Sequence, residues 1–267
     1  MRTIAVIQNK GGVGKTTVTC NLAAALAKKK PKARVLIVDM DGQGNQALSF
    51  GIEPQKLENT IYDVLVNGLP ASKAIVSLGK ENLDLLPAND DMNYFELDTL
   101  PGLKSGDIRN YLLKLRKVLS PLRKKYDFAF IDCPPELKII AAMVMMAADE
   151  IYIPFEPDAY NAQGLIRLLE KIELYKEQYG MSPEIKGVIP MKVKRRTLLH
   201  QGVLVQVDAY CKMKGIPLMR TKIPDSIRYP EFIASARMPI VWADPNGEHA
   251  RYYFDLLEEV LSSGSSV

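Results

Sequence analysis

Residues 10–17 read Lys10-Gly11-Gly12-Val13-Gly14-Lys15-Thr16-Thr17 and follow an apolar segment at residues 3–8. The glycines allow the backbone to curl so that successive N–H groups face one side, and a helix that begins here adds the positive end of its dipole. The pattern over residues 16–29 predicts such a helix. We therefore predict a phosphate-binding loop in which Lys15 contacts the β- and γ-phosphates and the Thr16 hydroxyl binds Mg²⁺.

On both sides of this loop, short apolar segments alternate with longer amphipathic ones. The apolar segments hardly alternate with polar residues, which is typical of strands buried on both faces. They predict strands at residues 3–8, 34–39, 83–87, 128–132, 150–154, 185–190 and 218–223. Helical spacing predicts helices at residues 16–29, 107–125, 161–178, 198–213 and 248–261. This alternation predicts an α/β fold: one domain over residues 1–267 with a mostly parallel, twisted sheet flanked by helices on both faces, and a short flexible tail at 262–267.

The composition excludes several classes of protein. With 267 residues, 47% hydrophobic and 25% charged, the chain is neither disordered, collagen-like nor a coiled-coil rod. Its longest apolar stretch, residues 139–148, is too short to cross a bilayer. No signal peptide is recognisable, so we expect a cytoplasmic protein. The three cysteines, Cys20, Cys133 and Cys211, are scattered and form neither a disulfide framework nor a zinc motif.

Carboxylates follow two of the predicted strands. Asp39 and Asp41 come at the end of the strand at residues 34–39, and Asp132 ends the strand at residues 128–132. Ligands of open α/β sheets bind at the carboxyl ends of the strands, so these side chains are expected beside the phosphate loop. An apolar strand that ends in Asp is the Walker B pattern, in which Asp132 would hold Mg²⁺ through water.

Basic residues are concentrated in one part of the chain. Residues 186–228 contain ten Lys or Arg against two Asp, although the whole chain has a net charge of only +4. Few aromatic residues lie between these cations, which favours contacts with a phosphate backbone over base reading. The segment predicts salt-sensitive, sequence-independent DNA binding. A basic run at residues 28–32 lies instead at a predicted helix C-terminus, where cations favour the helix dipole.

These motifs resemble those of one family. Lys10 stands where the ordinary phosphate loop has glycine, and the resulting KGGVGKTT is similar to the deviant Walker A motif of the ParA/MinD family of P-loop ATPases. Residues 39–45 resemble the family's DxDxQGN motif, with Gly42 in place of the usual proline. Residues 132–135 resemble its DxPP element, followed by Glu136 where serine is frequent. The resemblance extends from Met1 to about Leu261.

The resemblance implies roles for these residues. Lys10 would cross a dimer interface to the nucleotide of the other subunit, Asp41 would activate the attacking water, and Asp39 would support the Mg²⁺ shell. Lys10, Lys15 and Asp41 are the candidate catalytic residues. Loop residues 10–17 are the candidate ATP ligands, together with Pro224 and Asp225 near the adenine. Thr16, Asp39 and Asp132 are the candidate metal residues.

Among the ParA-type members, the resemblance implies an ATP-dependent DNA segregation ATPase for a plasmid or chromosome. Its ATP-bound sandwich homodimer would bind DNA nonspecifically in the nucleoid, and a ParB-type centromere-binding partner would stimulate slow ATP hydrolysis and release. The candidate DNA-binding residues are Lys192, Lys194, Arg195, Arg196, Arg220, Lys222 and Arg228.

Two alternatives use the same fold and remain open. A ParA-like ATPase that positions a protein cargo on the nucleoid would share every residue named above. A MinD-like regulator that cycles on membranes would need a basic amphipathic C-terminal helix, whereas residues 255–261 are acidic. We therefore expect no membrane partner. An iron–sulfur carrier would need paired cysteines, and the sequence has no C-x-x-C.

Overall fold

The apolar segments of the sequence form the central sheet of the computed structural model, which describes residues 1–79, 82–101, 108–136, 138–158, 160–194 and 197–263. Its seven strands lie in the order β3-β4-β2-β5-β1-β6-β7. The strands are β1 (Arg2–Val6), β2 (Val35–Asp39), β3 (Val76–Ser77), β4 (Leu83–Leu86), β5 (Phe128–Asp132), β6 (Glu150–Phe155) and β7 (Glu184–Pro190). Only the two-residue β3 is antiparallel to its neighbour, which confirms the predicted mostly parallel sheet.

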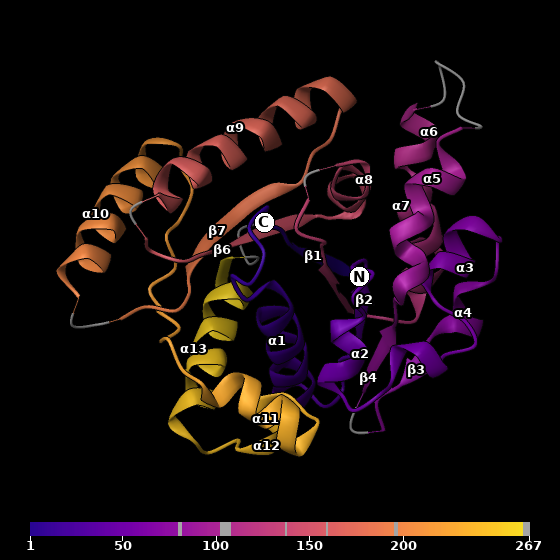
Figure 1. Cartoon of the computed structure of the whole chain (residues 1–267), viewed down its shortest axis with the longest axis horizontal. Coiled ribbons are helices and arrows are strands. Elements are labelled where there is room, and N and C mark those ends of the chain that lie inside the picture. Colours follow the sequence, from indigo (N-terminus) through magenta and orange to yellow (C-terminus); the bar gives the residue numbers. More distant parts are fainter. Residues whose placement is uncertain (80–81, 102–107, 137, 159, 195–196, 264–267) are drawn as a thin grey trace.

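Helices cover both faces of this sheet. The α-helices are α1 (Lys15–Lys29), α2 (Asn45–Ser49), α3 (Ile61–Val66), α4 (Ala71–Ala74), α5 (Phe95–Thr99), α6 (Ile108–Leu112), α7 (Lys114–Leu119), α8 (Ile139–Ala147), α9 (Asn161–Tyr179), α10 (Leu198–Met213), α11 (Arg228–Ala236), α12 (Ile240–Ala243) and α13 (Glu248–Ser263). Short 3-10 helices are η1 (Pro54–Lys56), η2 (Asp90–Tyr94) and η3 (Pro121–Lys124). In Figure 1, α1 and α13 lie side by side below the strands, and α8 and α9 lie above them.

The sheet separates two hydrophobic cores, because successive side chains of a strand point to opposite faces. Ile4 and Val6 of β1 pack with α1, α12 and α13. Ala5 on the same strand and Ile7 just after it pack with the helices from α7 to α10 on the other face. All four side chains are fully buried, which explains why the strands are apolar without alternation.

Residues 218–223 do not form the predicted strand. Two isolated bridges join this segment to its neighbour, at Val188 with Leu218 and at Val193 with Pro224. The Met219 N–H donates to the Val188 oxygen and the Ile223 N–H to the Pro190 oxygen, both at 2.9 Å. Between them, the backbone N–H groups of Arg220 and Thr221 both donate to the Glu259 carboxylate on α13, at 2.8 Å. The Thr221 amide, which would continue the ladder between those of Met219 and Ile223, is therefore bound to a helix side chain, and the prediction of a strand was wrong.

Two helical predictions also need correction. The helix predicted at residues 107–125 is divided into α6, α7 and η3, and Pro121 begins η3. Residue 107, the predicted start, lies outside the described residues. The apolar segment at residues 139–148, which was assigned no element, contains the helix α8. In the described part of the chain, none of the helices is both long and apolar enough for a membrane crossing.

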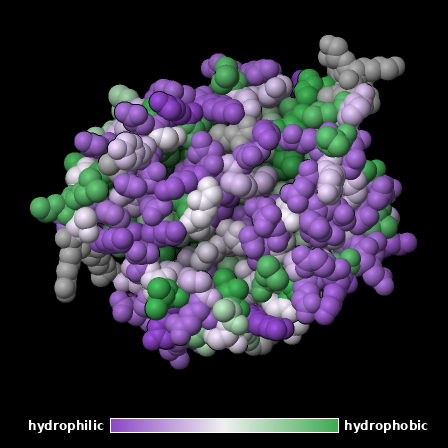
Figure 2. Space-filling model, in the orientation of Figure 1, coloured by the Kyte–Doolittle hydropathy of each residue, from purple (hydrophilic) through white to green (hydrophobic). Residues whose placement is uncertain are grey.

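The topology brings the sequence motifs to one edge of the sheet. Strands β2, β5 and β1 are neighbours, with Asp39 opposite Asp132 and Asp132 opposite Val6. All three strands run in the same direction, so the loop after β1 and the residues that follow β2 and β5 leave the sheet at the same end. Figure 2 shows apolar residues scattered over one face of the molecule, without a single large apolar patch.

Candidate functional site

The motif at residues 10–17 spans the end of the connection between β1 and α1 and the first residues of α1. Gly12 and Gly14 have φ values of +71° and +99°, in the left-handed region that glycine tolerates and other residues rarely adopt. Gly14 is the N-cap of α1, and no acidic residue lies in the first turn of that helix. The first N–H groups of a helix have no partner within it, so this end of α1 offers donors and positive potential to an anion.

The outer side of the loop is open, whereas its last glycine is tightly packed. A Cβ atom added to Gly11 or Gly12 would meet nothing within 4 Å. A Cβ atom on Gly14 would lie 2.9 Å from Cε of Met191, which follows β7. The open side is the side on which a phosphate chain can approach the backbone.

The two lysines of the loop have different surroundings. Lys15 is only 7% exposed, and its Nζ donates to the Lys10 carbonyl oxygen at 3.4 Å, so its ammonium group lies over the loop. The Lys10 side chain is 44% exposed, and its Nζ bonds to Oε2 of Glu156, just after β6, at 2.9 Å. In a single subunit the Lys10 ammonium group is therefore held by a carboxylate of its own chain.

Asp39 and Asp132 form a buried pair of carboxylates. Asp39 accepts the backbone N–H groups of Asp41 and Gln46, at 3.0 and 3.1 Å, so each of its oxygens supports the loop that follows β2. One oxygen of Asp132 accepts the Gln46 side-chain amide at 2.8 Å. The other, Oδ1, is buried and has no hydrogen-bond partner in the described part of the chain.

Gln46 joins the parts of the site and was missed by the sequence analysis. Its fully buried side-chain amide donates to Asp132 and to the Thr16 carbonyl oxygen at 3.2 Å, and its backbone N–H donates to Asp39. It thus connects α1, β2 and β5. The only signal in the sequence is its position after the Asp39–Asn45 motif, because glutamine carries no charge or spacing that marks it as buried.

Burial also changes the acidity of the two carboxyl groups. Desolvation raises the pKa of Asp132 to about 6, although hydrogen bonds from Thr16 and Gln46 oppose the shift. Burial, with the nearby charge of Asp132, raises the pKa of Asp39 well above its usual value. The charged forms of both carboxyl groups are therefore unfavourable in the folded protein, and a bound cation would stabilise them.

Asp41 lies at the edge of a hollow of about 430 Å³ between the loop after β2 and Pro134–Pro135 after β5. Its Oδ1 accepts the Gln43 N–H at 3.1 Å, which ties the carboxylate to the loop after β2. A Cβ atom on Gly42 would lie 2.5 Å from Oδ1 of Asn93, so the Asn93 side chain occupies the space of the missing proline ring.

The donor set fits a magnesium-bound phosphate group. Magnesium prefers oxygen ligands, and it is usually held by one or two carboxylates with water and phosphate oxygens. The buried Asp132 Oδ1 without a partner and the adjacent Thr16 hydroxyl supply such oxygens. Among the described residues, no cluster of three or more His, Cys, Asp or Glu side chains offers an alternative metal site.

The candidate adenine residues lie on the same rim of the sheet. Pro224 bridges to Val193, and the Asp225 N–H bonds to the Val193 oxygen at 3.4 Å. The Asp225 carboxylate lies 3.7 Å from Nζ of Lys194. Because Met191 of the same segment contacts Gly14, the 191–194 segment links this loop to the phosphate loop.

The candidate DNA-binding cations are spread over several elements. Arg220 lies 3.7 Å from Glu259, and Arg228 lies 3.7 Å from Glu231. Lys192 and Lys222 have no ion-pair partner in the part of the chain that the structure describes. Arg195 and Arg196 lie outside the described residues. The net charge of the segment thus overstates the number of free cations, because Glu231 and Glu259 lie beyond its sequence bounds.

Comparison with known proteins adds three findings. Residues 1–186 match a family model described as an AAA domain. The chain is 34% identical over 261 residues to the sporulation initiation inhibitor protein Soj of Bacillus subtilis, with 98% of each covered. It is 34% identical over 262 residues to the chromosome partitioning protein ParA of Myxococcus xanthus, covering 97% of this chain and 88% of that protein.

A solved structure agrees over the whole chain. Cobyrinic acid a,c-diamide synthase from Mycobacterium smegmatis, with a bound ATP analog and magnesium, superposes with a TM-score of 0.83 at 27% identity. The match covers 100% of this chain and 96% of that one. The likeness extends from the phosphate loop to the last helix.

Proposed function

Because the chain belongs to the ParA family of P-loop ATPases, we propose that it is an ATP-dependent DNA segregation ATPase that binds ATP with Mg²⁺. The observation that carries this proposal is the meeting of the Lys10–Thr17 loop with Asp41 and Asp132 at one edge of the sheet, while Lys10 remains partly exposed. The identity to the Soj and ParA relatives over nearly their full lengths supports it.

Hydrolysis would proceed by positioning and charge neutralisation, since phosphoryl transfer to water requires no covalent bond to the protein. The N–H groups of the loop and Lys15 would bind the β- and γ-phosphates. Asp41, which lines the hollow beside the loop, would orient the attacking water. Thr16 and Asp132 would hold Mg²⁺, which neutralises phosphate charge when it is bound, and Asp39 would fix the loop that carries Asp41.

The pairing of Lys10 with Glu156 supports a slow basal rate. To reach the nucleotide of a second subunit, the Lys10 ammonium group must leave the Glu156 carboxylate of its own chain. An exposed pair of this kind contributes only about 0–1 kcal/mol, so dimer formation on ATP can replace it readily. A lone subunit would then lack one of the cations that stabilise the transition state.

The basic residues support nonspecific DNA binding by the dimer. Lys192 and Lys222, which have no acidic partner among the described residues, would contribute most, with Lys194, Arg220 and Arg228 exchanging their carboxylates for phosphates. A ParB-type centromere-binding protein would supply sequence recognition and stimulate hydrolysis. The protein would then act in the cytoplasm on the nucleoid.

The proposal is tested by measuring sedimentation and binding to random-sequence DNA with a non-hydrolysable ATP analogue, with ADP and without nucleotide. We expect dimers and DNA binding only with the analogue. Lys10→Ala should abolish both, while Lys28→Ala, which removes an exposed lysine of α1, should leave them unchanged. DNA binding that ignores nucleotide and Lys10 would contradict the proposal.

A further inference from the structure

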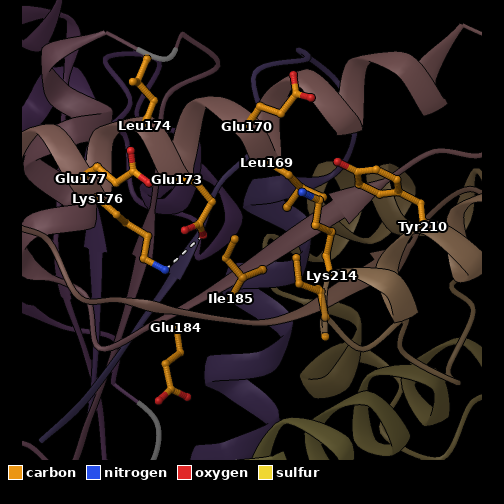
Figure 3. Close-up of a pocket in the computed structure, with 12 residues that line it drawn as sticks. Leu169, Glu170, Glu173, Leu174, Lys176, Glu177, Glu184, Ile185, Tyr210 and Lys214 are labelled. Atoms are coloured by element: carbon orange, nitrogen blue, oxygen red, sulfur yellow. Dashed lines mark hydrogen bonds and ion pairs between the residues drawn. The ribbon is translucent and has the colours of Figure 1, made fainter.

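A groove far from the phosphate loop runs between α9 and the end of α10, along the outer side of β7. It encloses about 590 Å³. Leu169 and Ile185 with Ile216 give it an apolar floor, and Leu174 at its rim is 56% exposed. In Figure 3, Ile185 lies between the Glu173–Lys176 pair on one side and Lys214 on the other.

The groove lies over the open part of an edge strand. β7 is the last strand of the sheet, and on its outer side the backbone contacts begin only at Val188, whose N–H donates to the Pro217 oxygen at 2.9 Å. Glu184 and Ile185, which line the groove, precede this contact. An edge strand without a neighbour can pair with an extended segment of another chain.

The charged residues around the groove favour a positively charged ligand. Four glutamates line it, against Lys176 and Lys214; the glutamates are Glu170, Glu173, Glu177 and Glu184. Lys176 is bonded to Glu173 at 3.1 Å, and Glu184 pairs with Lys186. Glu170 and Glu177 have no ion-pair partner within the described ranges. The lining is therefore acidic in a chain whose net charge is +4, and it repels nucleic acid and anionic lipid.

We infer that this groove is a docking site for a basic, extended segment of a partner protein, with an apolar side chain between its cations. The apolar side chain would cover Leu169 and Ile185, and the flanking cations would pair with Glu170 and Glu177. The segment would continue the sheet beside the first residues of β7. This inference goes beyond the proposed ATPase function, because the groove contains none of the nucleotide residues.

A dye-labelled, end-capped synthetic peptide, Gly-Lys-Leu-Lys-Val-Lys-Gly, tests the inference by fluorescence anisotropy with the full chain. We expect saturable binding that weakens with salt, and no binding of the same peptide with Glu in place of Lys. Reversing both unpaired carboxylates, Glu170→Lys with Glu177→Lys, should weaken binding at least tenfold. The matched control is Glu53→Lys with Glu58→Lys, two exposed glutamates elsewhere, and should bind as the wild type does.

The outcomes separate this inference from the proposed function. If the wild type fails to bind the peptide, or if both double variants bind it equally, the docking site is excluded. Equally tight binding of the acidic peptide excludes it as well. ATP and DNA binding are measured on the same groove variant and should be unchanged. Their absence from the wild type would contradict the ATPase proposal and leave the groove result standing.

Discussion

Asp132 combines two requirements that oppose each other. It must be charged to hold a cation, yet it is fully buried beside Asp39, and burial penalises the charged form. Gln46 offsets only part of this penalty by donating a hydrogen bond at 2.8 Å. Without a bound cation, this pair of carboxylates is therefore less stable than a neutral pair would be.

Asp132→Asn should raise the free energy of unfolding at pH 7.5 without Mg²⁺ by about 1–3 kcal/mol, while abolishing Mg²⁺-dependent hydrolysis. The folded-state pKa of Asp132 is raised to about 6, so the charged form costs stability above that pH. Between about pH 4 and 6 the wild type loses stability as pH rises, and below about pH 4 the advantage of the variant vanishes. Thermal unfolding across this range checks the prediction. A less stable variant at pH 7.5 would contradict it.

The two left-handed glycines of the loop differ in packing, and this difference can be measured. Gly12→Ala should cost about 1–2 kcal/mol from its φ alone, because an added Cβ meets open space. Gly14→Ala should cost more, because its Cβ also lies 2.9 Å from Met191. Urea unfolding of both variants, with and without Met191→Ala, tests the argument. With Met191→Ala, the losses in the free energy of unfolding caused by Gly12→Ala and Gly14→Ala should become similar. If the difference between them is unchanged, contact with Met191 does not explain the greater loss at Gly14.

Among the secondary-structure elements, the sequence predicted the central buried strands and the long amphipathic helices best. Residues 128–132 and 198–213 form β5 and α10 with the predicted bounds. Polar residues, or a change in the period of the hydrophobic pattern, mark the ends of these segments. The segment 218–223 has strand composition, but Glu259, about 40 residues away, binds its amides. Helix α8 is apolar all round, and a buried helix of this kind has no amphipathic signal.

The candidate site was predictable where chemistry is tied to short spacing. Lys15, Asp39, Asp41 and Asp132 meet at one edge, as strand ends in a parallel sheet require. Gln46 and the Lys10–Glu156 contact were not predictable, because both depend on residues brought together across the sheet. Whether each residue performs its expected role stays a prediction.

Helix α13 contains a hydroxyl that stabilises nothing. Tyr253 is fully buried against Tyr229, and its Oη has no hydrogen-bond partner among the described residues. Tyr253→Phe should therefore leave stability unchanged or raise it by about 1 kcal/mol. The matched control is Tyr152→Phe, because the buried Tyr152 hydroxyl bonds to Ser263 at 2.6 Å and its loss should cost about 1 kcal/mol. Equal effects in chemical unfolding would contradict the assignment.

On the scale of the whole molecule, ion pairs decide how many cations face a ligand. Most of the described cations in residues 186–228 have an acidic partner, as in Lys212 with Asp208 and Arg228 with Glu231. A count of charges along the segment does not include acidic partners from outside it, such as Glu231 and Glu259. Electrostatic binding by this region therefore depends on fewer residues than the count suggests.

Lys192→Ala with Lys222→Ala should weaken binding to random-sequence DNA and reduce the slope of log affinity against log salt by about 2. Both lysines lack an acidic partner among the described residues, so their charge is available to phosphates. Titrations at several salt concentrations, with the ATP analogue present, check the slope. The control is Lys28→Ala in the last turn of α1 with Lys32→Ala just after that helix. If the control pair changes the slope and the test pair does not, the DNA surface lies on the basic run at residues 28–32.

The strand order also affects how the chain folds during its synthesis. The first strand is inserted between β5 and β6, and the last helix lies against α1 through Leu256 and Leu257. During translation, β1 can find no neighbour until β5 (Phe128–Asp132) has been made, and α1 stays partly uncovered until α13 follows. The nucleotide loop between β1 and α1 therefore cannot reach its final structure until both β5 and α13 have been synthesised.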